Sequence, residues 1–503
     1  MTANLFNAFK PAFANANARP ALSLRGGRII TYGDLECAAA RMAALLKVEG
    51  VAPGDRVAVQ VKKSAESVFL YLACLKAGAV YLPLNTAYTD SELDYFFGDA
   101  EPRLIVCTPE RAGGIRKLSS SQDATIHTLD ADGGGSLTQA ASGMRDDSQP
   151  VHRVAADLAA ILYTSGTTGR SKGAMITHGN LHANAETLID AWGISSDDVL
   201  LHALPIYHVH GLFVALNTCL MTSAQMLFHQ KFDTDAVLGD LPHSTLMMGV
   251  PTFYTRLLAS SRLDTDCCRN MRLFIAGSAP LLDETFRAFE QRTGHAILER
   301  YGMTETGMLC SNPLKGDRRP GTVGPPLADV EVRVASESGS IVAPGEVGIL
   351  EVRGPNVFNG YWRMPEKTTE EFREDGFFIT GDISRIDEDG YVHIVGRAKD
   401  MIISGGFNVY PKEIEAVIDQ VDGVGESAVI GLPHPDFGEG VAAVATGDGV
   451  EEEAVIAACR TQLASFKVPK AVFVLDELPR NAMGKVQKNQ LRECYAQAFQ
   501  NTR

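Results

Sequence analysis

Apolar and polar positions along the first 330 residues follow the periods of strands and helices in turn. Residues 56–61 form a short apolar run, residues 65–77 have the spacing of an amphipathic helix that ends at Gly78, and residues 79–84 form a second apolar run. A strand, a helix and a strand in this order predict a βαβ unit with parallel pairing. Further buried strands are predicted at 104–107, 158–163 and 271–276. The pattern therefore predicts an α/β fold with parallel or mixed sheets.

Beyond about residue 320, short strands separated by turns replace this alternation. From residue 401 onward we predict a separate α+β unit with a helix over 411–421, where Pro411 suits the first helical turn. Residues 130–150 are rich in Gly, Ser and Asp and predict a surface excursion. The short strands, which indicate a small β-rich subdomain, are predicted at 330–334, 348–352 and 391–395. A chain of 503 residues is too long for one hydrophobic core, so two or more domains are expected.

The charge balance excludes some classes of partner. The chain has 46 Lys and Arg against 61 Asp and Glu, a net charge of −15, so we expect no general binding to nucleic acid or to an anionic membrane. Anionic substrates would then need local cationic sites. The hydrophobic share of 45% and the charged share of 21% are ordinary for a soluble globular protein. We expect a monomer or a small homo-oligomer.

The cysteines and the N-terminal residues help to predict the cellular compartment of the protein. Nine cysteines are scattered without Cys-x-x-Cys pairs, and Cys267 and Cys268 are adjacent, which indicates neither a disulfide framework nor a zinc site. No apolar run reaches the roughly 18–20 residues of a membrane span. Four cationic residues precede the first acidic one, Asp34, which is compatible with a weak organellar transit signal. We prefer a short packed helix over residues 4–9, and a cytoplasmic protein.

The densest candidate chemistry follows the predicted strand at 158–163. Residues 164–173 are almost all small, hydroxylated or cationic. Glycine lets backbone amides approach an anion closely and hydroxyls donate hydrogen bonds to it, which favours a polyphosphate loop over a flexible surface turn. Gly169 and Lys172 are separated by two residues, which excludes a Walker A loop. The predicted phosphate-binding residues are Thr164, Ser165, Gly166, Thr167, Thr168, Gly169 and Lys172.

Four more motifs follow in order along the chain, at 301–305 (Tyr-Gly-Met-Thr-Glu), 380–382 (Thr-Gly-Asp), 396–400 (Gly-Arg-Ala-Lys-Asp) and 479–485 (Pro-Arg-Asn-Ala-Met-Gly-Lys). With the phosphate loop, they resemble the motifs of the acyl-adenylate-forming enzymes, which include acyl-CoA synthetases, firefly luciferase and nonribosomal-peptide adenylation domains. The resemblance implies a large N-terminal domain, residues 1–398, and a small mobile α+β C-terminal domain, residues 399–503. It also implies that the C-terminal domain rotates about Lys399 between two half-reactions, with the active site in a crevice between the domains.

The same resemblance implies a nucleotide site. Glu305 would ligate Mg²⁺, which prefers a carboxylate with phosphate oxygens and waters, and Thr304 would donate to the α-phosphate. The alternative is an ordinary helix start, with Thr304 as its cap. Relatives often have Asn where this chain has Arg300, so its adenine-facing wall differs. The residues implied around ATP are Gly277, Ser278, Ala279, Glu299, Arg300, Tyr301, Gly302 and Met303, with Asp382 and Arg397 at the ribose.

Catalysis is expected to depend on Lys485. The resemblance places its ammonium between the substrate carboxylate and the α-phosphate, where two anions must meet. Lys488 is expected to play a supporting role. Acylation of Lys485 would remove its charge and switch the enzyme off, which is a hypothesis. Ser404, Gly405 and Gly406 would admit the pantetheine arm of coenzyme A, although an ordinary glycine turn is the alternative.

Three residues suggest which acid is activated. His208 aligns with an aromatic gate near the acyl pocket of relatives, and Ser278 borders that pocket. Arg256 lies in an otherwise uncharged stretch, where a buried guanidinium would need a second substrate carboxylate; an arginine pointing to solvent is the alternative. Segments 81–89, 205–208 and 408–415 make the chain similar to malonyl-CoA synthetases.

The expected reaction converts malonate, with methylmalonate as a further candidate, ATP and coenzyme A into acyl-CoA, AMP and pyrophosphate, with Mg²⁺. The alternatives are a ligase for another short or aromatic acid, an adenylation module that loads a carrier protein, and a phosphate-loop NTPase that would release ADP and orthophosphate.

Overall fold

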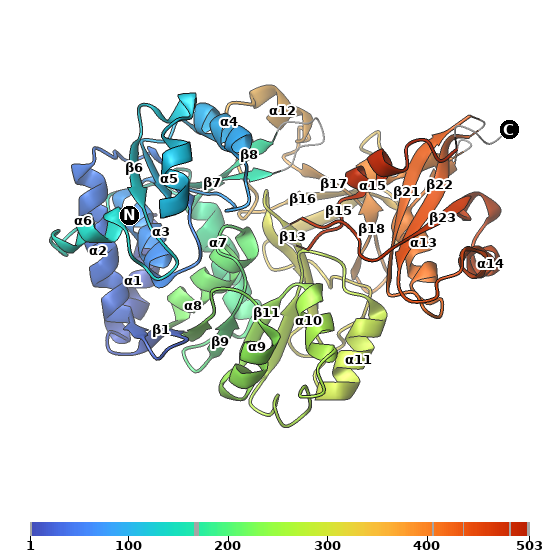
Figure 1. The fold of residues 1–503 in the computed structure, drawn as a ribbon, viewed down its shortest axis with the longest axis horizontal. Coiled ribbons are helices and arrows are strands. Elements are labelled where there is room, and N and C mark those ends of the chain that lie inside the picture. Colours follow the sequence, from blue (N-terminus) through green and yellow to red (C-terminus); the bar gives the residue numbers. More distant parts are fainter. Residues whose placement is uncertain (1–2, 165–170, 405–406, 436, 482–483, 500–503) are drawn as a thin grey trace. The chain divides into compact units, whose positions relative to one another are not determined.

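The computed structural model describes residues 3–164, 171–404, 407–435, 437–481 and 484–499. The chain divides into two compact units (Figure 1). The first comprises Met1–Glu331 with Val352–Phe378, and the second comprises Val332–Glu351 with Ile379–Arg503. The division at residue 398 that the hinge motif predicts stays a prediction. No helix among the described residues is long and apolar enough to cross a membrane.

One sheet of the first unit contains the predicted βαβ unit. Its strand order is β6-β5-β3-β4-β7-β8, and all neighbours are parallel except β7 and β8. The strands are β3 (Arg56–Gln60), β4 (Val80–Pro83), β5 (Leu104–Cys107), β6 (Thr125–Thr128), β7 (Leu158–Thr164) and β8 (Lys172–Thr177). Helix α3 (Ala65–Ala77) joins β3 to β4 and ends at Gly78, whose φ of 69° favours glycine. It is buried on nearly every side, so its predicted amphipathic character was wrong.

A second sheet of the first unit supplies the strands that precede the candidate site. Its order is β14-β13-β12-β11-β9-β10-β1-β2, parallel from β13 to β1 and antiparallel at both edges. The strands are β1 (Pro20–Leu24), β2 (Ile29–Thr31), β9 (Val199–His202), β10 (Gln225–Phe228), β11 (Leu246–Gly249), β12 (Leu273–Ala276), β13 (Leu298–Met303) and β14 (Gly307–Ser311). The mixed parallel and antiparallel sheets confirm the predicted fold class.

Helices cover these two sheets (Figure 1). The predicted N-terminal helix is α1, which buries Phe6, Phe9 and Phe13. The predicted excursion at 130–150 contains a short helix, α6. The helices of this unit are α1 (Phe6–Asn15), α2 (Tyr32–Val48), α3, α4 (Asp90–Ala100), α5 (Pro109–Ile115), α6 (Ser136–Ser142), α7 (His178–Trp192), α8 (Asn217–Thr222), α9 (Thr234–Asp240), α10 (Pro251–Leu258), α11 (Asp283–Thr293) and α12 (Pro365–Glu370), with a π-helical segment at His210–Leu216.

The second unit is built on two smaller sheets. The first follows the order β15-β16-β17-β18 and contains the short strands predicted after residue 320. The other follows β20-β19-β22-β21, with β23 beside β22. The strands are β15 (Glu331–Ala335), β16 (Gly348–Arg353), β17 (Phe378–Ile386), β18 (Val392–Arg397), β19 (Ile402–Ser404), β20 (Phe407–Val409), β21 (Glu426–His434), β22 (Gly438–Thr446) and β23 (Ala471–Leu475). The helices are α13 (Pro411–Ile418), α14 (Glu452–Gln462) and α15 (Lys488–Cys494).

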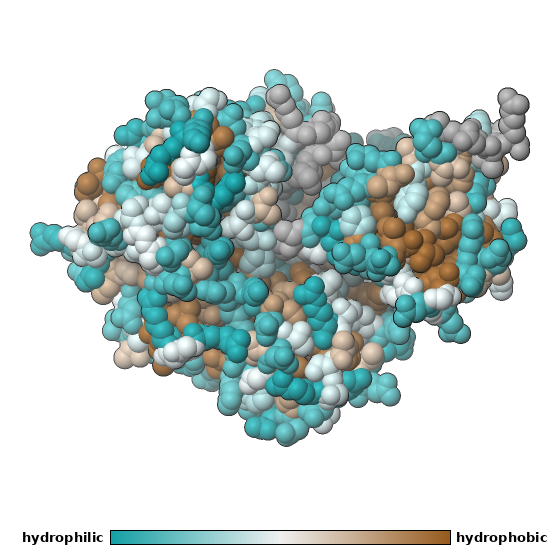
Figure 2. Space-filling model, viewed as in Figure 1, coloured by the Kyte–Doolittle hydropathy of each residue, from teal (hydrophilic) through white to brown (hydrophobic). Residues whose placement is uncertain are grey.

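Large apolar side chains are exposed on the surface of the second unit. Figure 2 shows brown, hydrophobic atoms gathered on the visible face of this unit. Its exposed large apolar residues include Ile403, Phe407 and Phe437.

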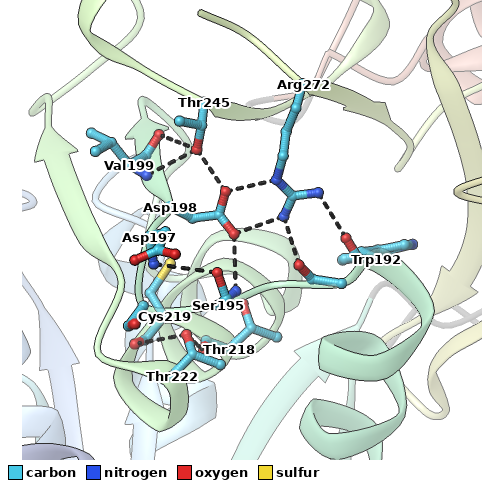
Figure 3. Close-up of polar contacts among 12 residues, drawn as sticks. Trp192, Ser195, Asp197, Asp198, Val199, Thr218, Cys219, Thr222, Thr245 and Arg272 are labelled. Carbon is cyan, nitrogen blue, oxygen red and sulfur yellow. Dashed lines mark hydrogen bonds and ion pairs between the residues drawn. The ribbon is translucent and has the colours of Figure 1, made fainter.

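An ion pair between the buried Asp198 and the partly exposed Arg272 connects three segments of the first unit (Figure 3). Asp198, just before β9, accepts hydrogen bonds from Nε and Nη2 of Arg272 at 2.7 Å each, and from Thr245 Oγ1 at 2.7 Å. Arg272 also donates to the carbonyl of Trp192 at the end of α7, at 3.0 Å. Burial alone would raise the pKa of Asp198, but these hydrogen bonds outweigh it and hold the pKa below its usual range.

We predict that Arg272→Met destabilises the first unit by about 3 kcal/mol, because it leaves the buried carboxylate of Asp198 without its charged partner. Urea unfolding followed by tryptophan fluorescence measures this, since Trp192 and Trp362 both lie in this unit. Arg262→Met is the matched control: Arg262 pairs with Asp235 at 2.8 Å on the exposed surface, and its loss should cost under about 1 kcal/mol. Equal effects of the two substitutions would contradict the prediction.

Candidate active site

The predicted phosphate loop joins two antiparallel strands. Thr164 ends β7, Lys172 begins β8, and the two residues are register partners. The predicted residues Ser165, Gly166, Thr167, Thr168 and Gly169 lie outside the described residues, so their roles stay predictions.

Glu305 sits in a tight turn between β13 and β14. Thr304, Glu305 and Thr306 form this turn, so the alternative of a helix start is wrong. Gly302 makes the turn possible, because a Cβ there would come 2.1 Å from the carbonyl oxygen of Gly307. The predicted residues Glu299, Arg300, Tyr301, Gly302 and Met303 all lie on β13, which leads directly into the turn.

Polar contacts connect this turn to both ends of the phosphate loop. Glu305 Oε1 accepts hydrogen bonds from Thr164 Oγ1 at 3.2 Å and from the Tyr361 hydroxyl at 3.3 Å. The same hydroxyl lies 2.6 Å from Glu371 Oε2, and Lys172 Nζ lies 2.8 Å from Glu371 Oε1. The structure thus brings Thr164, Lys172 and Glu305 together.

Lys172 is held by this network and is 7% exposed. Its ammonium also lies 4.1 Å from the centroid of the Tyr361 ring, a cation–π contact. Burial alone would raise the pKa of Glu371, but the hydrogen bonds from Lys172 and Tyr361 keep it below its usual range. The geometry therefore favours Lys172 as the anchor of one end of the loop. Sequence reasoning missed Tyr361 and Glu371, which belong to none of the motifs.

A buried arginine on β13 forms no ion pair with any residue that the structure describes. Arg300 is 3% exposed, and its Nε and Nη2 have no hydrogen-bond partner among the described residues. Its guanidinium lies over Gly277, where a Cβ would come 2.4 Å from Nη1. Burial lowers the pKa of Arg300 to about 9. The cost of a buried charge is large unless an anion pairs with it.

Two polar side chains lie beside this arginine. Ser278 Oγ is 3.3 Å from Nδ1 of His210, and Ser278 adopts a left-handed φ of 71°, uncommon outside glycine. His210 is buried, and its Nε2 has no hydrogen-bond partner among the described residues. Burial first, and then the charge of Arg300, lower the pKa of His210 well below its usual value, so the ring is neutral. The predicted gate residue His208 and the predicted Ala279 are half-buried nearby in sequence.

Arg256 does not meet its expectation. It lies on α10 and is exposed, so the inference from a buried guanidinium was wrong for this residue and applies instead to Arg300. The sequence pattern misled because an uncharged stretch can be one turn of a surface helix. A substrate contact by Arg256 stays a prediction.

The predicted ribose residues pair with each other in the second unit. Asp382 on β17 and Arg397 on β18 are register partners, and Arg397 Nε lies 2.6 Å from Asp382 Oδ1. Asp382 is 2% exposed and Lys399 is exposed in the short helical turn that follows β18. Ser404 is buried at the end of β19, while Gly405 and Gly406 lie outside the described residues.

Lys485 lies on a loop that is supported within the second unit. Its backbone N donates to Asn481 Oδ1 at 3.0 Å, and its carbonyl accepts from Asn481 N at 2.9 Å. Lys488, three residues on, lies 2.5 Å from Glu415 on α13, and its supporting role stays a prediction. Arg480 pairs with Glu426 on the other side of the loop. The side chain of Lys485 is exposed, and its catalytic role stays a prediction.

Two family models match the chain. The model described as AMP-binding enzyme matches residues 9–362, and that of the AMP-binding enzyme C-terminal domain matches residues 413–485. The chain therefore belongs to the AMP-binding enzyme family, and it is an acid–thiol ligase of that family, as its motifs predicted.

Three relatives illustrate the range of similarity. The solved structure of ATP-bound MatB from Rhodopseudomonas palustris is 56% identical, covers 99% of this chain and 100% of its own, and has a TM-score of 0.96. A feruloyl-CoA synthase from an Amycolatopsis species is 38% identical, with 93% of this chain and 95% of the relative covered. A malonate–CoA ligase from Arabidopsis thaliana is 34% identical, with 97% and 89% covered.

We predict that Lys172 acts through Glu371 and not by direct contact with phosphate. Lys172→Met and Glu371→Gln should each weaken ATP binding about tenfold, since either change breaks the ion pair that holds the buried Lys172 end of the loop, although Lys367 at 3.2 Å still pairs with Glu371 in Lys172→Met. The double variant should lose no more than the worse single one, because both changes break the same contact. Isothermal titration calorimetry with ATP measures the three dissociation constants.

The neighbouring Glu370→Gln is the control, since Glu370 is an exposed partner of Lys367 at 3.0 Å. It should leave ATP binding unchanged. Additive losses in the double variant would instead assign Lys172 to the phosphates.

Proposed function

We propose that the chain is an ATP-dependent malonate–CoA ligase that works through an acyl-adenylate. The observation that carries this choice of acid is the buried, uncompensated guanidinium of Arg300 beside Ser278 and His210. A monocarboxylic acid spends its single carboxylate on the reaction with ATP. A dicarboxylic acid has a second one, which can pair with Arg300 in a bidentate ion pair and remove the cost of its burial.

The relatives alone do not choose between acids. The names of those at 38% and 34% identity specify ferulate and malonate, respectively. An aromatic acid would need an apolar pocket wall, and a buried guanidinium would destabilise its ring unless the ring lay flat on it. A short diacid matches the charge of Arg300, so malonate is favoured and methylmalonate is a second candidate. The aromatic-acid ligase is the alternative that the first of these relatives supports.

The proposed reaction has two steps. A carboxylate oxygen of malonate attacks the α-phosphorus of ATP, a new P–O bond forms, the bond to the bridging oxygen breaks, and pyrophosphate leaves. The sulfur of coenzyme A then attacks the acyl carbon, its proton passes to solvent, and AMP leaves. In this scheme Thr304 donates to the α-phosphate, Asp382 accepts from the ribose hydroxyls, and the segment at Ser404 admits the pantetheine arm.

Glu305 is suited to hold Mg²⁺ in this scheme. Both hydrogen bonds to its carboxylate go to Oε1, and Oε2 accepts none from the described residues. No group of three or more His, Cys, Asp and Glu side chains in the described ranges is arranged to hold a metal ion by itself. A site with one protein carboxylate fits Mg²⁺, which takes its other ligands from phosphates and water and would neutralise phosphate charge.

Lys485 is proposed to stabilise the meeting of the two anions, after rotation of the C-terminal domain about Lys399. An ammonium about 4 Å from a charge contributes on the order of 4 kcal/mol at an effective dielectric near 20. We therefore predict that Lys485→Met slows adenylation about 1,000-fold. Thioester formation from supplied malonyl-adenylate and coenzyme A should be nearly unaffected.

Single-turnover assays of the two half-reactions measure these effects separately. Lys488→Met is a control for loop support, because it should reduce stability as well as rate. Acylation of Lys485 should have the same effect as the methionine. A fully active Lys485→Met variant would contradict the assignment.

We predict that malonate is the preferred acid in a panel of mono- and dicarboxylates assayed by pyrophosphate release. Arg300→Met should lower kcat/KM for malonate at least about 100-fold, since it removes a charged hydrogen-bonding partner. The dissociation constant for ATP should change less than about threefold. Arg262→Met is the matched control, because Arg262 is an exposed arginine of the same unit that pairs with Asp235, and a smaller effect is expected.

Three outcomes would redirect the proposal. Preference for an aromatic acid would favour the alternative ligase. Loss of ATP binding in Arg300→Met would place Arg300 at the nucleotide. Acylation of a carrier protein in preference to free coenzyme A would identify a loading module.

A further inference from the structure

A folded-back segment carries one of the residues beside Arg300, His210. Residues 203–211 comprise the connection that follows β9 and the first two residues of the π-helical segment. The chain turns so tightly that a Cβ at Gly211 would lie 2.1 Å from the carbonyl oxygen of Pro205. Backbone carbonyl groups in such a turn lie outside regular secondary structure. When they are buried, they need hydrogen-bond donors from other residues.

Lys63 supplies donors to the start of this segment. It precedes α3, is 7% exposed, and belongs to none of the sequence motifs. Its ammonium donates to the carbonyls of His202 at 2.8 Å and Leu204 at 2.9 Å, and lies 2.8 Å from Nδ1 of His202. Three N–H groups and three acceptors match, with the ring of Phe228 beneath the ammonium at 4.1 Å.

His202 links Lys63 to the end of the segment through its two ring nitrogens. Its Nε2 lies 2.9 Å from the carbonyl oxygen of Gly211, so Nε2 carries the proton and Nδ1 is free to accept from Lys63. Burial, and then the charge of Lys63, lower the pKa of His202 well below its usual value, in agreement with a neutral ring. Lys63 thus supports the first residues directly and Gly211 through one imidazole.

This arrangement is unusual for a buried lysine. No carboxylate among the described residues forms an ion pair with Lys63, and burial lowers its pKa well below the usual value. A methionine of similar length would fill the same space without a buried charge, so packing alone does not require a lysine here. What a methionine cannot do is donate to three acceptors at once.

We propose that Lys63 is a positioning residue for substrate selection, which holds segment 203–211 in the conformation that places His210 against Ser278 beside Arg300. The proposal rests on the proposed function, since it takes these three residues as the site of the second carboxylate. Lys63 touches neither substrate nor nucleotide in this proposal and acts through His202.

The test compares two buried lysines of the first unit. Lys63→Met should raise KM for the preferred acid about 10-fold to 100-fold, the usual size for the loss of hydrogen bonds to a charged group. KM for ATP should stay within about twofold, and Lys63→Arg, which keeps charge and donors, should recover part of the loss. Lys76→Met is the matched control: Lys76 is 3% exposed, with Glu36 at 4.0 Å and the Phe6 ring at 4.5 Å, and it does not contact the segment.

The acid used is the one that wild-type protein prefers in the panel. A preference for a monocarboxylic acid would refute the malonate assignment, while the comparison of KM values would still test Lys63. Equal changes in both KM values, or an acid KM that changes as much in Lys76→Met, would overturn the proposal. If Lys63→Met does not fold, Lys63→Arg and His202→Gln are measured by the same criteria. Failure of all three to fold while Lys76→Met folds would assign Lys63 a structural role only.

Discussion

A positive charge inside a protein is unfavourable unless something compensates it, and the first unit of this chain buries three such charges near its candidate site. The compensation differs in each case. Lys172 has a carboxylate, Glu371, at 2.8 Å. Lys63 has three neutral acceptors that match its three N–H groups. Arg300 has no partner for Nε and Nη2 among the described residues, and the partner that we propose for it is an anionic substrate.

These three solutions correspond to three tasks. A charge neutralised by a carboxylate is fixed in place and suits an anchor, as Lys172 suits the end of a loop. A charge solvated by backbone carbonyls shapes the segment that supplies them. A charge left uncompensated attracts a ligand, because binding then removes a cost that the folded protein already bears. The kind of partner around each buried cation therefore indicates the role of that cation.

The candidate catalytic lysine differs from these three cations because it is exposed. Lys485 is exposed, and its loop is held by contacts within its own unit, from Asn481, Arg480 and Lys488. A loop that carries a proposed catalytic group benefits from such internal support, since the loop then keeps its shape whatever its unit contacts. The pairing of Asp382 with Arg397 across two strands orders the proposed ribose site in the same way.

Local signals in the sequence determined much of this protein. Apolar periodicity placed α3 and the strands around it within a residue or two, and the motifs at Thr164, Glu305, Asp382 and Lys485 identified the family that the comparisons then confirmed. Such signals work because strand and helix periods, and loops specialised for phosphate, are properties of neighbouring residues.

Only the tertiary structure decided which cations are buried and what surrounds them. Arg256 lies in an uncharged stretch of the sequence and Arg300 directly follows Glu299, yet Arg256 is exposed on α10 and Arg300 is enclosed on β13. The partners of Lys172 and Lys63 lie more than 130 residues away, at Glu371 and His202. Burial and long-range pairing arise from how sheets and helices assemble, and no local pattern encodes them. Local motifs therefore predicted the class of reaction, whereas the surroundings of Arg300, which support the proposed choice of acid, became visible only in the tertiary structure.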